Sequence, residues 1–322
     1  MDEKLVNILN EMADYLNVSQ MKKLQEVLLK NLVTEPVERK EISNTEYLKL
    51  FLDAKRIEGC SERTLQYYRV TAEHMLKKLS TPIRKMTTDE IRAYLVEYQQ
   101  EGGCSKVTVD NIRRNISSFF SWLEEEDYIL KSPMRRIHKI KTKTVVKDVI
   151  SDETMEKMRD ACEEIRDLAI IDLLYSTGIR VGELVRLNIA DVNLEQRECV
   201  VFGKGDKERR VYFDAKAKIH LMEYLAQRKD DNPALFVSLD SPYTRLQISG
   251  VEIRIRELGR KLSLNRIHPH KFRRTMATRA IDKGMPIEQV QKILGHSQID
   301  TTMQYAIVNQ NNVKSSHQKY IA

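Results

Sequence analysis

The chain has 322 residues, of which 41% are hydrophobic and 31% charged, a composition suited to two packed domains. No stretch approaches the ~20 consecutive apolar residues of a membrane span, and the start Met1-Asp2-Glu3-Lys4 lacks the basic and apolar blocks of a secretory signal. We therefore expect a cytoplasmic protein that does not associate with membranes. The formal net charge of +7 favours a polyanionic partner, which is weak evidence when taken alone.

The four cysteines are far apart in the chain and form no Cys-x-x-Cys pair. Neither a zinc site nor a disulfide framework is indicated, and we expect Cys162 and Cys199 to be core residues. No cluster of carboxylates has the pattern of a magnesium site. We expect the protein to use no metal and no cofactor.

Residues 1–40 have the pattern of two short amphipathic helices, ended by Pro36. Because acidic and basic residues balance here, we do not expect this segment to clamp DNA. It is either a helical appendage packed on the next domain or an arm that contacts another subunit. The apolar positions of the two helices are Leu5, Ile8, Leu9 and Met12, and then Leu24, Val27, Leu28 and Leu32.

The pattern of residues 43–130 predicts a domain of four helices. Capping boxes begin at Ser43 and at Thr87. A helix near residues 105–124 has a broad apolar face, which predicts a place at the centre of the domain. Its other face is basic and supplies candidate DNA contacts, namely Lys106, Arg113 and Arg114.

Residues 131–149 form the clearest boundary, a basic linker with no acidic residue between Lys131 and Lys147. Pro133 favours an extended start. Such a linker could wrap a duplex and add salt-dependent affinity, or it could be a solvated connection without a partner. Its candidate DNA contacts are Arg135, Arg136, Lys139 and Lys141.

Residues 150–322 predict a second, mostly helical domain that opens with an N-cap at Ser151. Two β-rich runs, 198–202 and 209–213, flank the tight sequence Gly203-Lys204-Gly205-Asp206-Lys207 and predict a hairpin. The expected fold class is therefore mainly α with a small β-hairpin or sheet.

Several side chains of this second domain could together cleave a phosphodiester. Arginine forks grip non-bridging phosphate oxygens and stay charged. A tyrosine phenol, with a pKa of ~10, becomes a nucleophile where cations stabilise the developing charge. A lysine at a hairpin tip could protonate the leaving oxygen. The residues with these properties are Arg180, Lys204, His270, Arg273, His296 and Tyr305.

Three further residues could support this set. Glu183, one turn after Arg180, could brace that arginine, and Lys207 and Arg209 could contact the DNA backbone beside the hairpin tip. Taken singly, all of these residues have ordinary explanations, since a surface arginine, a lysine in a turn or one of 13 tyrosines needs no function. Their combination carries the argument.

The motifs that contain these residues resemble those of the tyrosine recombinase family, which includes phage and transposon integrases and the Xer recombinases. Many relatives have asparagine at the place of Ser132 and histidine at the place of Arg274, and neither departure removes a catalytic group. Residues 43–130 resemble the family's helical core-binding domain less specifically. The matching motifs are Thr177-Gly178-Ile179-Arg180, Gly203-Lys204-Gly205, His270-Lys271-Phe272-Arg273, Leu294-Gly295-His296-Ser297 and Tyr305.

The resemblance implies a two-domain, C-shaped clamp around duplex DNA and cleavage without a metal or ATP. Tyr305 would attack the scissile phosphate and leave a 3′-phosphotyrosyl bond. Arg180 and Arg273 would hold the phosphate, and His296 or His270 would assist. Lys204 would be the general acid. The tail 306–322 would dock on a neighbouring subunit and close a homotetramer on paired recombination sites, or it is a frayed terminus.

We favour an integrase of a phage or mobile element, because residues 1–40 exceed what a minimal Xer protein would have. A chromosome- or plasmid-dimer resolvase of the Xer type is the alternative. An accessory directionality factor or a partner recombinase would fit either role, and the protein would associate with the nucleoid. Remote alternatives are a type IB topoisomerase, a non-catalytic DNA-binding regulator and a metal-dependent tyrosine endonuclease, the last suggested by His268-Pro269-His270.

Overall fold

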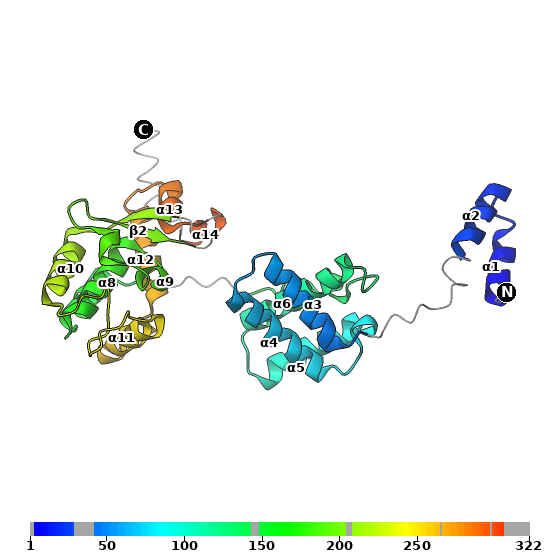
Figure 1. Cartoon of the computed structure of the whole chain (residues 1–322), viewed down its shortest axis with the longest axis horizontal. Coiled ribbons are helices and arrows are strands. Elements are labelled where there is room, and N and C mark those ends of the chain that lie inside the picture. Colours follow the sequence, from blue (N-terminus) through cyan, green and yellow to red (C-terminus); the bar gives the residue numbers. More distant parts are fainter. Residues whose placement is uncertain are drawn as a thin grey trace. The chain divides into compact units, whose positions relative to one another are not determined.

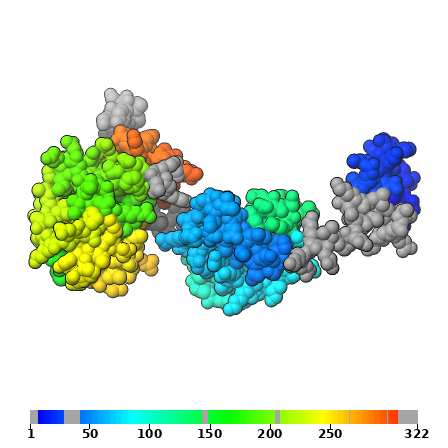
Figure 2. All heavy atoms as spheres, viewed as in Figure 1, coloured from blue at the N-terminus to red at the C-terminus, as the bar shows by residue number. Residues whose placement is uncertain are grey.

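The computed structural model describes residues 3–28, 42–142, 148–203, 208–264, 266–296 and 298–305. The chain divides into two compact units, Met1–Thr144 and Val145–Ala322. Figure 1 labels their helices and strands, and Figure 2 draws their atoms. Each unit has its own hydrophobic core. Within the described ranges, no helix is both long and apolar enough to cross a membrane.

The first unit begins with two short helices, as the sequence predicts: α1 (Glu3–Met12) and α2 (Val18–Leu28). No side chain described between residues 7 and 28 is buried. This helical pair therefore packs no core of its own.

Four further helices build the core of the first unit, namely α3 (Asn44–Ile57), α4 (Glu62–Lys78), α5 (Thr88–Glu101) and α6 (Lys106–Glu125). The predicted N-caps form, since the Ser43 hydroxyl accepts a hydrogen bond from the backbone of Glu46 and Thr87 makes a reciprocal capping box with Glu90. A short 3-10 helix, η2 (Ile83–Lys85), connects α4 to α5.

Helix α6 runs through the centre of this core, as its broad apolar face predicts. Phe119 and Phe120 are at most 1% exposed, and the ring of Phe119 lies 5.1 Å from that of Phe51 on α3.

The stretch expected to be an extended linker begins instead as part of the first unit. Ser132 caps a 3-10 helix, η3 (Pro133–Arg136), so Pro133 starts a helical turn and not an extended segment. The carboxylate of Glu124 on α6 accepts hydrogen bonds from Arg135 and from the backbone of Ser132. The prediction of a linker was based on the charges of this stretch. It did not take into account the apolar residues that pack against the core, namely Met134, Ile137 and Ile140.

The second unit is mostly helical around a small sheet. Three strands pair antiparallel in the order β1-β2-β3, with bounds Val192–Asn193, Glu198–Phe202 and Glu208–Tyr212. A 3-10 helix, η4 (Ile189–Asp191), precedes β1. The helices are α7 (Asp152–Asp160), α8 (Ile165–Thr177), α9 (Val181–Leu184), α10 (Ala215–Gln227), α11 (Ile248–Lys261), α12 (Pro269–Asp282), α13 (Ile287–Leu294) and α14 (Asp300–Met303).

Helix α8 is the centre of this unit, and both α10 and α12 pack against it. Its middle is enclosed by other elements, since Ile171, Leu173 and Leu174 are at most 1% exposed, and the one charged side chain there, the buried Asp172, pairs with Arg159 and His220. The predicted fold class is confirmed, since the chain is mainly α with a small sheet that contains the predicted hairpin. Strand β3 begins one residue earlier than expected.

Candidate active site

The turn between α8 and α9 presents Arg180. Gly178 ends α8 with a φ of 64°, a left-handed conformation that glycine adopts without strain, and a Cβ there would collide with the side chain of Met276 on α12. The Thr177 hydroxyl donates to a backbone carbonyl of α8 (2.5 Å) and accepts from the backbone N–H of Ile179 (3.3 Å). The chain turns sharply here, and the side chain of Arg180 is left 43% exposed.

Glu183 on α9 is the centre of a buried ion-pair network. Its carboxylate, 5% exposed, accepts hydrogen bonds from the backbone N–H and from the guanidinium of Arg180, each 2.8 Å long. The guanidinium of Arg209 on β3 donates to the same two oxygens, at 2.8 Å to Oε1 and 2.7 Å to Oε2. Burial raises the pKa of Glu183, but the hydrogen bonds from Arg209 and Arg180 outweigh burial and hold that pKa below its ordinary value. Glu183 is therefore an anion at neutral pH.

Arg209 was expected to contact the DNA backbone, and that prediction is wrong. Its side chain is only 11% exposed, and its Nε donates to the Ile293 carbonyl on α13 at 2.8 Å while both Nη atoms bind Glu183. In a basic run beside a hairpin, an arginine resembles a surface cation. The signal that was missed is the two-residue period of a strand, which puts Arg209 on the same face as the buried Val211.

Arg273 on α12 is buried, with 2% of its surface exposed. Its Nη1 donates to the Gly178 carbonyl at 2.8 Å, and its Nη2 donates to the Leu294 carbonyl at 2.6 Å and to Nε2 of His296 at 3.0 Å. Burial, and after it the positive charge of Arg180, lower the pKa of Arg273 to about 10, so the guanidinium stays charged at neutral pH.

His270 lies one turn before Arg273 on α12. His270 is exposed at the start of the helix, whereas Arg273 points into the core. The His270 ring stands nearly parallel to that of His268, with 6.5 Å between the ring centroids.

His296 follows α13 at a turn made by Gly295, whose φ is 64°. Because arginine cannot accept a hydrogen bond, Nε2 of His296 accepts from Arg273. The ring proton therefore sits on Nδ1, which donates to the Thr302 hydroxyl at 2.8 Å. Burial, followed by the charge of Arg273, lowers the pKa of His296 to about 4. The imidazole is neutral near pH 7.

Tyr305 lies just after the one-turn helix α14. The helix begins at Asp300 and ends at Met303, too early to include the tyrosine. The side chain of Tyr305 is 5% exposed and packs in a small core with Ala277, Val290 and Leu294. Its ring centroid lies 6.1 Å from that of His296.

The remaining predicted residues fall into three groups. Lys204 and Lys207 lie outside the described residues. Arg113 is only 12% exposed and its Nε donates to Asp110 at 2.8 Å, so it neutralises an internal carboxylate and is not the open DNA contact that was expected. The other candidate DNA contacts are exposed, namely Lys106, Arg114, Arg135, Arg136, Lys139 and Lys141.

Thr302 is a part of the site that sequence reasoning missed. It is fully buried, and its hydroxyl accepts the Nδ1 proton of His296. A hydroxyl between a candidate histidine and a candidate tyrosine was the available signal.

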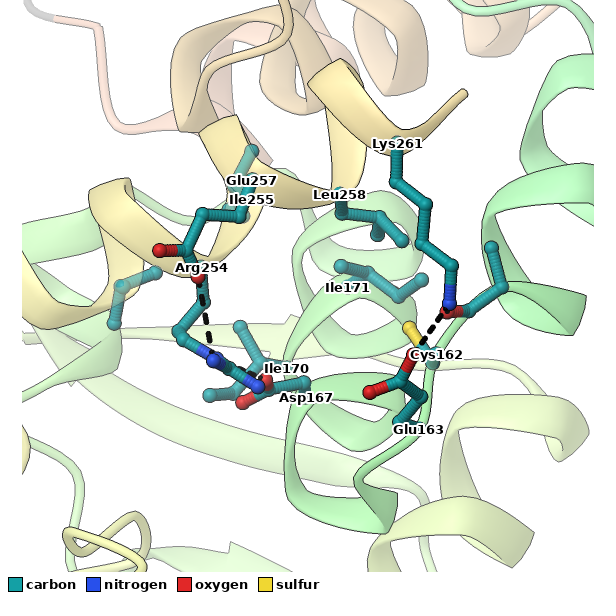
Figure 3. Close-up of a pocket in the computed structure, with 12 residues that line it drawn as sticks. Cys162, Glu163, Asp167, Ile170, Ile171, Arg254, Ile255, Glu257, Leu258 and Lys261 are labelled. Carbon is teal, nitrogen blue, oxygen red and sulfur yellow. Dashed lines mark hydrogen bonds and ion pairs between the residues drawn. The ribbon is translucent and has the colours of Figure 1, made fainter.

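No group of three or more His, Cys, Asp or Glu side chains in the described part of the chain could hold a metal ion. A cavity of about 240 Å³ lies between α11 and the segment that joins α7 to α8 (Figure 3). Lys261 pairs with Glu163 at 2.6 Å and Arg254 with Asp167 at 2.7 Å along its wall. None of the candidate catalytic residues lines this cavity, so we do not assign it to the chemistry.

The described part of the site can bind an anion and stabilise charge that develops on it. The site contains three guanidinium groups, those of Arg180, Arg209 and Arg273, and one carboxylate, that of Glu183. The nearby imidazole of His296 is neutral, so the net charge of these groups is positive. Fixed donors in a partly buried site are worth more than the same groups in water. A phosphodiester with a developing negative charge matches this arrangement.

Comparisons with known proteins agree with the motifs. The profile of the phage integrase family matches residues 148–312, and that of the phage integrase N-terminal SAM-like domain matches residues 47–130. The chain is similar to tyrosine recombinase XerC of Oceanobacillus iheyensis, with 29% identity over 85% of this chain and 95% of the relative. It is also similar to tyrosine recombinase XerC of Thermodesulfovibrio yellowstonii, with 32% identity over 83% of this chain and 94% of the relative.

Solved structures share the fold. The Tn1549 transposon integrase, in complex with a circular intermediate DNA, superposes with a TM-score of 0.70 at 18% identity, over 85% of this chain and 98% of that one. A lambda integrase dimer bound to a COC′ core site superposes with a TM-score of 0.68 at 18% identity, over 88% of this chain and 85% of that one.

Proposed function

The chain belongs to the phage integrase family and is a tyrosine-type site-specific DNA recombinase, and on that premise we propose that it cuts and rejoins duplex DNA through a 3′-phosphotyrosyl bond to Tyr305. The family match spans both units, through residues 47–130 and 148–312. The two units would close around the duplex as a clamp, and the exposed basic residues of the first unit would contact its backbone.

Cleavage begins with attack of the Tyr305 phenol on the scissile phosphate. A bond forms between the phenolic oxygen and phosphorus while the bond from phosphorus to the 5′ oxygen breaks. The phenolic proton passes to solvent water, and the ammonium group of Lys204 donates a proton to the departing 5′ oxygen. Arg180 and Arg273 hold the non-bridging oxygens. The phosphotyrosyl bond retains the energy of the phosphodiester, so a 5′-hydroxyl rejoins the strand by the reverse attack without ATP.

The observation that carries this proposal is the direct contact of Arg273 with His296, whose ring in turn stacks near that of Tyr305. A charged phosphate donor, a neutral imidazole and a phenol are thereby gathered from α12, from the turn after α13 and from the end of α14. Because Nε2 of His296 carries no proton and accepts a hydrogen bond from Arg273, it has no proton to give to the leaving oxygen. Lys204 is then the better general acid.

Replacement of Tyr305 by phenylalanine tests the assignment. The Tyr305→Phe variant should bind DNA but form no SDS-resistant protein–DNA complex, because only the attacking oxygen is lost. Tyr212→Phe is the matched control, since Tyr212 is 55% exposed on β3 and takes no part in the proposed chemistry. A wild-type amount of covalent complex in Tyr305→Phe would refute the mechanism.

Integration or excision of a phage or mobile element is the role that we favour, because of the additional segment 1–40. Dimer resolution of the Xer type is the second candidate, and the names of the relatives at 29% and 32% identity favour it. Mapping covalent complexes on genomic DNA separates the two roles. An integrase should react at the ends of the element that encodes it, whereas a resolvase should react at a single chromosomal or plasmid site.

We also propose that the protein recombines DNA as a homotetramer, with or without an accessory directionality factor or a partner recombinase. Exchange between two duplexes needs four cleavage sites, and head-to-tail contacts that close into a ring provide four subunits. The polar tail carries apolar residues able to dock on a neighbour, namely Val313, Tyr320 and Ile321, all outside the described residues. Deleting Asn312–Ala322 should spare binding to a single site but abolish recombination. Normal recombination by the truncated protein would place the subunit contact elsewhere.

A further inference from the structure

Arg209 joins three elements of the candidate active site. It lies on β3, two residues after the hairpin tip 204–207. Its Nη atoms hold Glu183 on α9, and its Nε holds the Ile293 carbonyl near the end of α13. The side chain of one strand residue thus fixes the turn end of the hairpin to the helix of Glu183 and to the helix that precedes His296.

Gly295 leaves room for this arrangement. A Cβ at Gly295 would lie 3.0 Å from Cδ and 3.1 Å from Nε of Arg209, which is closer than side chains normally pack. Gly295 therefore has two roles. Its φ of 64° turns the chain toward His296, and the absence of a side chain leaves space for Arg209.

Arg209 also determines how much of Arg180 is available to a phosphate. Within the described part of the chain, Nη1 is the only guanidinium atom of Arg180 that binds Glu183. Both carboxylate oxygens are already held by Arg209. Without Arg209, the buried Glu183 would have Arg180 as its remaining guanidinium partner, and it would draw that side chain away from the exposed face of the site.

We propose that Arg209 is a positioning residue for DNA cleavage: it holds Glu183 so that Arg180 is free to bind the phosphate, and it sets the turn end of the hairpin against the turn of His296. This inference rests on the proposed function, since it concerns the same site. Arg209 acts through other residues and does not itself touch the phosphate. Its planar fork is essential, because a lysine ammonium cannot bind both oxygens of Glu183 and the Ile293 carbonyl in one plane.

The test compares variants of the full chain on a duplex that carries its mapped recombination site. Arg209→Met removes all three hydrogen bonds, and Arg209→Lys keeps the charge without the fork. The matched control is Arg228→Met, because Arg228 is also buried (6% exposed), pairs with Asp230 and donates to the Ala234 carbonyl at 2.6 Å, but lies at the end of α10. Rates of covalent-complex formation, binding to the site and thermal unfolding are measured for each.

Cleavage by Arg209→Met should fall by about 100-fold, the order of magnitude expected when a catalytic group is misplaced by about 1 Å. Binding should change little, and Arg209→Lys should lie between Arg209→Met and wild type. Arg228→Met should lower the unfolding temperature without lowering the cleavage rate of the folded protein. In the Glu183→Gln background, Arg209→Met should cost less than about threefold, because residues that act through one another are not additive.

The inference fails if Arg209→Met cleaves as fast as Arg228→Met, or if its effect in the Glu183→Gln background is undiminished. Should Arg209→Met fail to fold, the lysine variant decides: a wild-type cleavage rate in Arg209→Lys would show that the fork is unnecessary. Absence of any covalent complex with the wild-type protein at its mapped site would refute the proposed function itself, and this inference with it.

Discussion

Exchange of Arg273 for lysine tests the proposed phosphate site at its most buried point. The described residues accept three hydrogen bonds from this guanidinium, at the Gly178 carbonyl, the Leu294 carbonyl and His296. An arginine has five N–H donors, so two remain for a phosphate. Lysine offers three donors around one atom and cannot hold both carbonyls and a phosphate together. At least one buried carbonyl then loses its donor, at a cost of about 1–3 kcal/mol in folding free energy.

The effect on catalysis should be larger than the effect on folding. Loss of one donor to a developing oxyanion raises the barrier by about 2.7–4 kcal/mol, or roughly 100- to 1,000-fold in rate. We expect Arg273→Lys to bind DNA, to unfold at a lower temperature and to form covalent complex slower by that factor in a single-turnover assay. The matched control is Arg274→Lys, since Arg274 is the next residue on α12 and donates instead to the Asp148 carbonyl at 3.0 Å. Equal cleavage rates in the two variants would refute the role of Arg273.

Three further predictions concern protons and metals. A Lys204→Ala variant should cleave poorly. A substrate with a 5′-bridging sulfur should rescue it, because that leaving group needs no acid. If the variant still binds DNA but is not rescued, another residue is the general acid. Covalent-complex formation should persist in EDTA, because side chains supply the positive charge, and strict dependence on Mg²⁺ would revive the metal-dependent endonuclease. The pKa of His296 is about 4 in the folded protein and about 6.5 when unfolded, so the unfolded state binds a proton more readily than the folded state. The free energy of unfolding should therefore decrease as the pH falls between these two pKa values. The unfolding temperature of wild type should therefore fall more steeply there than that of His296→Asn, and parallel curves would contradict the depressed pKa.

The local structure of this chain follows closely from its sequence. Caps at Ser43, Thr87 and Ser151 begin α3, α5 and α7, because a side-chain oxygen beside an unsatisfied N–H is a contact between near neighbours. The hairpin is equally local, since two β-rich runs and a glycine turn define it. The turn at Gly178 before Arg180 is local as well, since a glycine with a φ of 64° ends α8 there.

Contacts between distant segments could not be predicted in the same way. The run that contains Arg209 is strongly basic, and its charge suggested solvent, whereas the strand period and a carboxylate on α9 bring the guanidinium inside. Arg113 was misjudged for a different reason, because its partner Asp110 is on the same helix one turn earlier, a local pairing that the spacing in the sequence allows. In both cases an acidic partner decided whether an arginine was available for DNA. Net charge along the chain contains no information about such pairing.

The two glycine motifs have one physical purpose in common. Gly178 ends α8 and Gly295 ends α13, both with a φ of 64°, and a helix that stops in this way leaves carbonyls of its last turn without intrahelical partners. The carbonyls of Gly178 and Leu294 are at these two ends, and both accept from Arg273. The negative ends of two helix dipoles thus meet one buried guanidinium, which makes burial of its charge tolerable without a carboxylate hydrogen-bonded to it. Because a carboxylate would neutralise Arg273, whereas carbonyl dipoles leave its full charge, the same design that buries the arginine keeps it able to attract a phosphate.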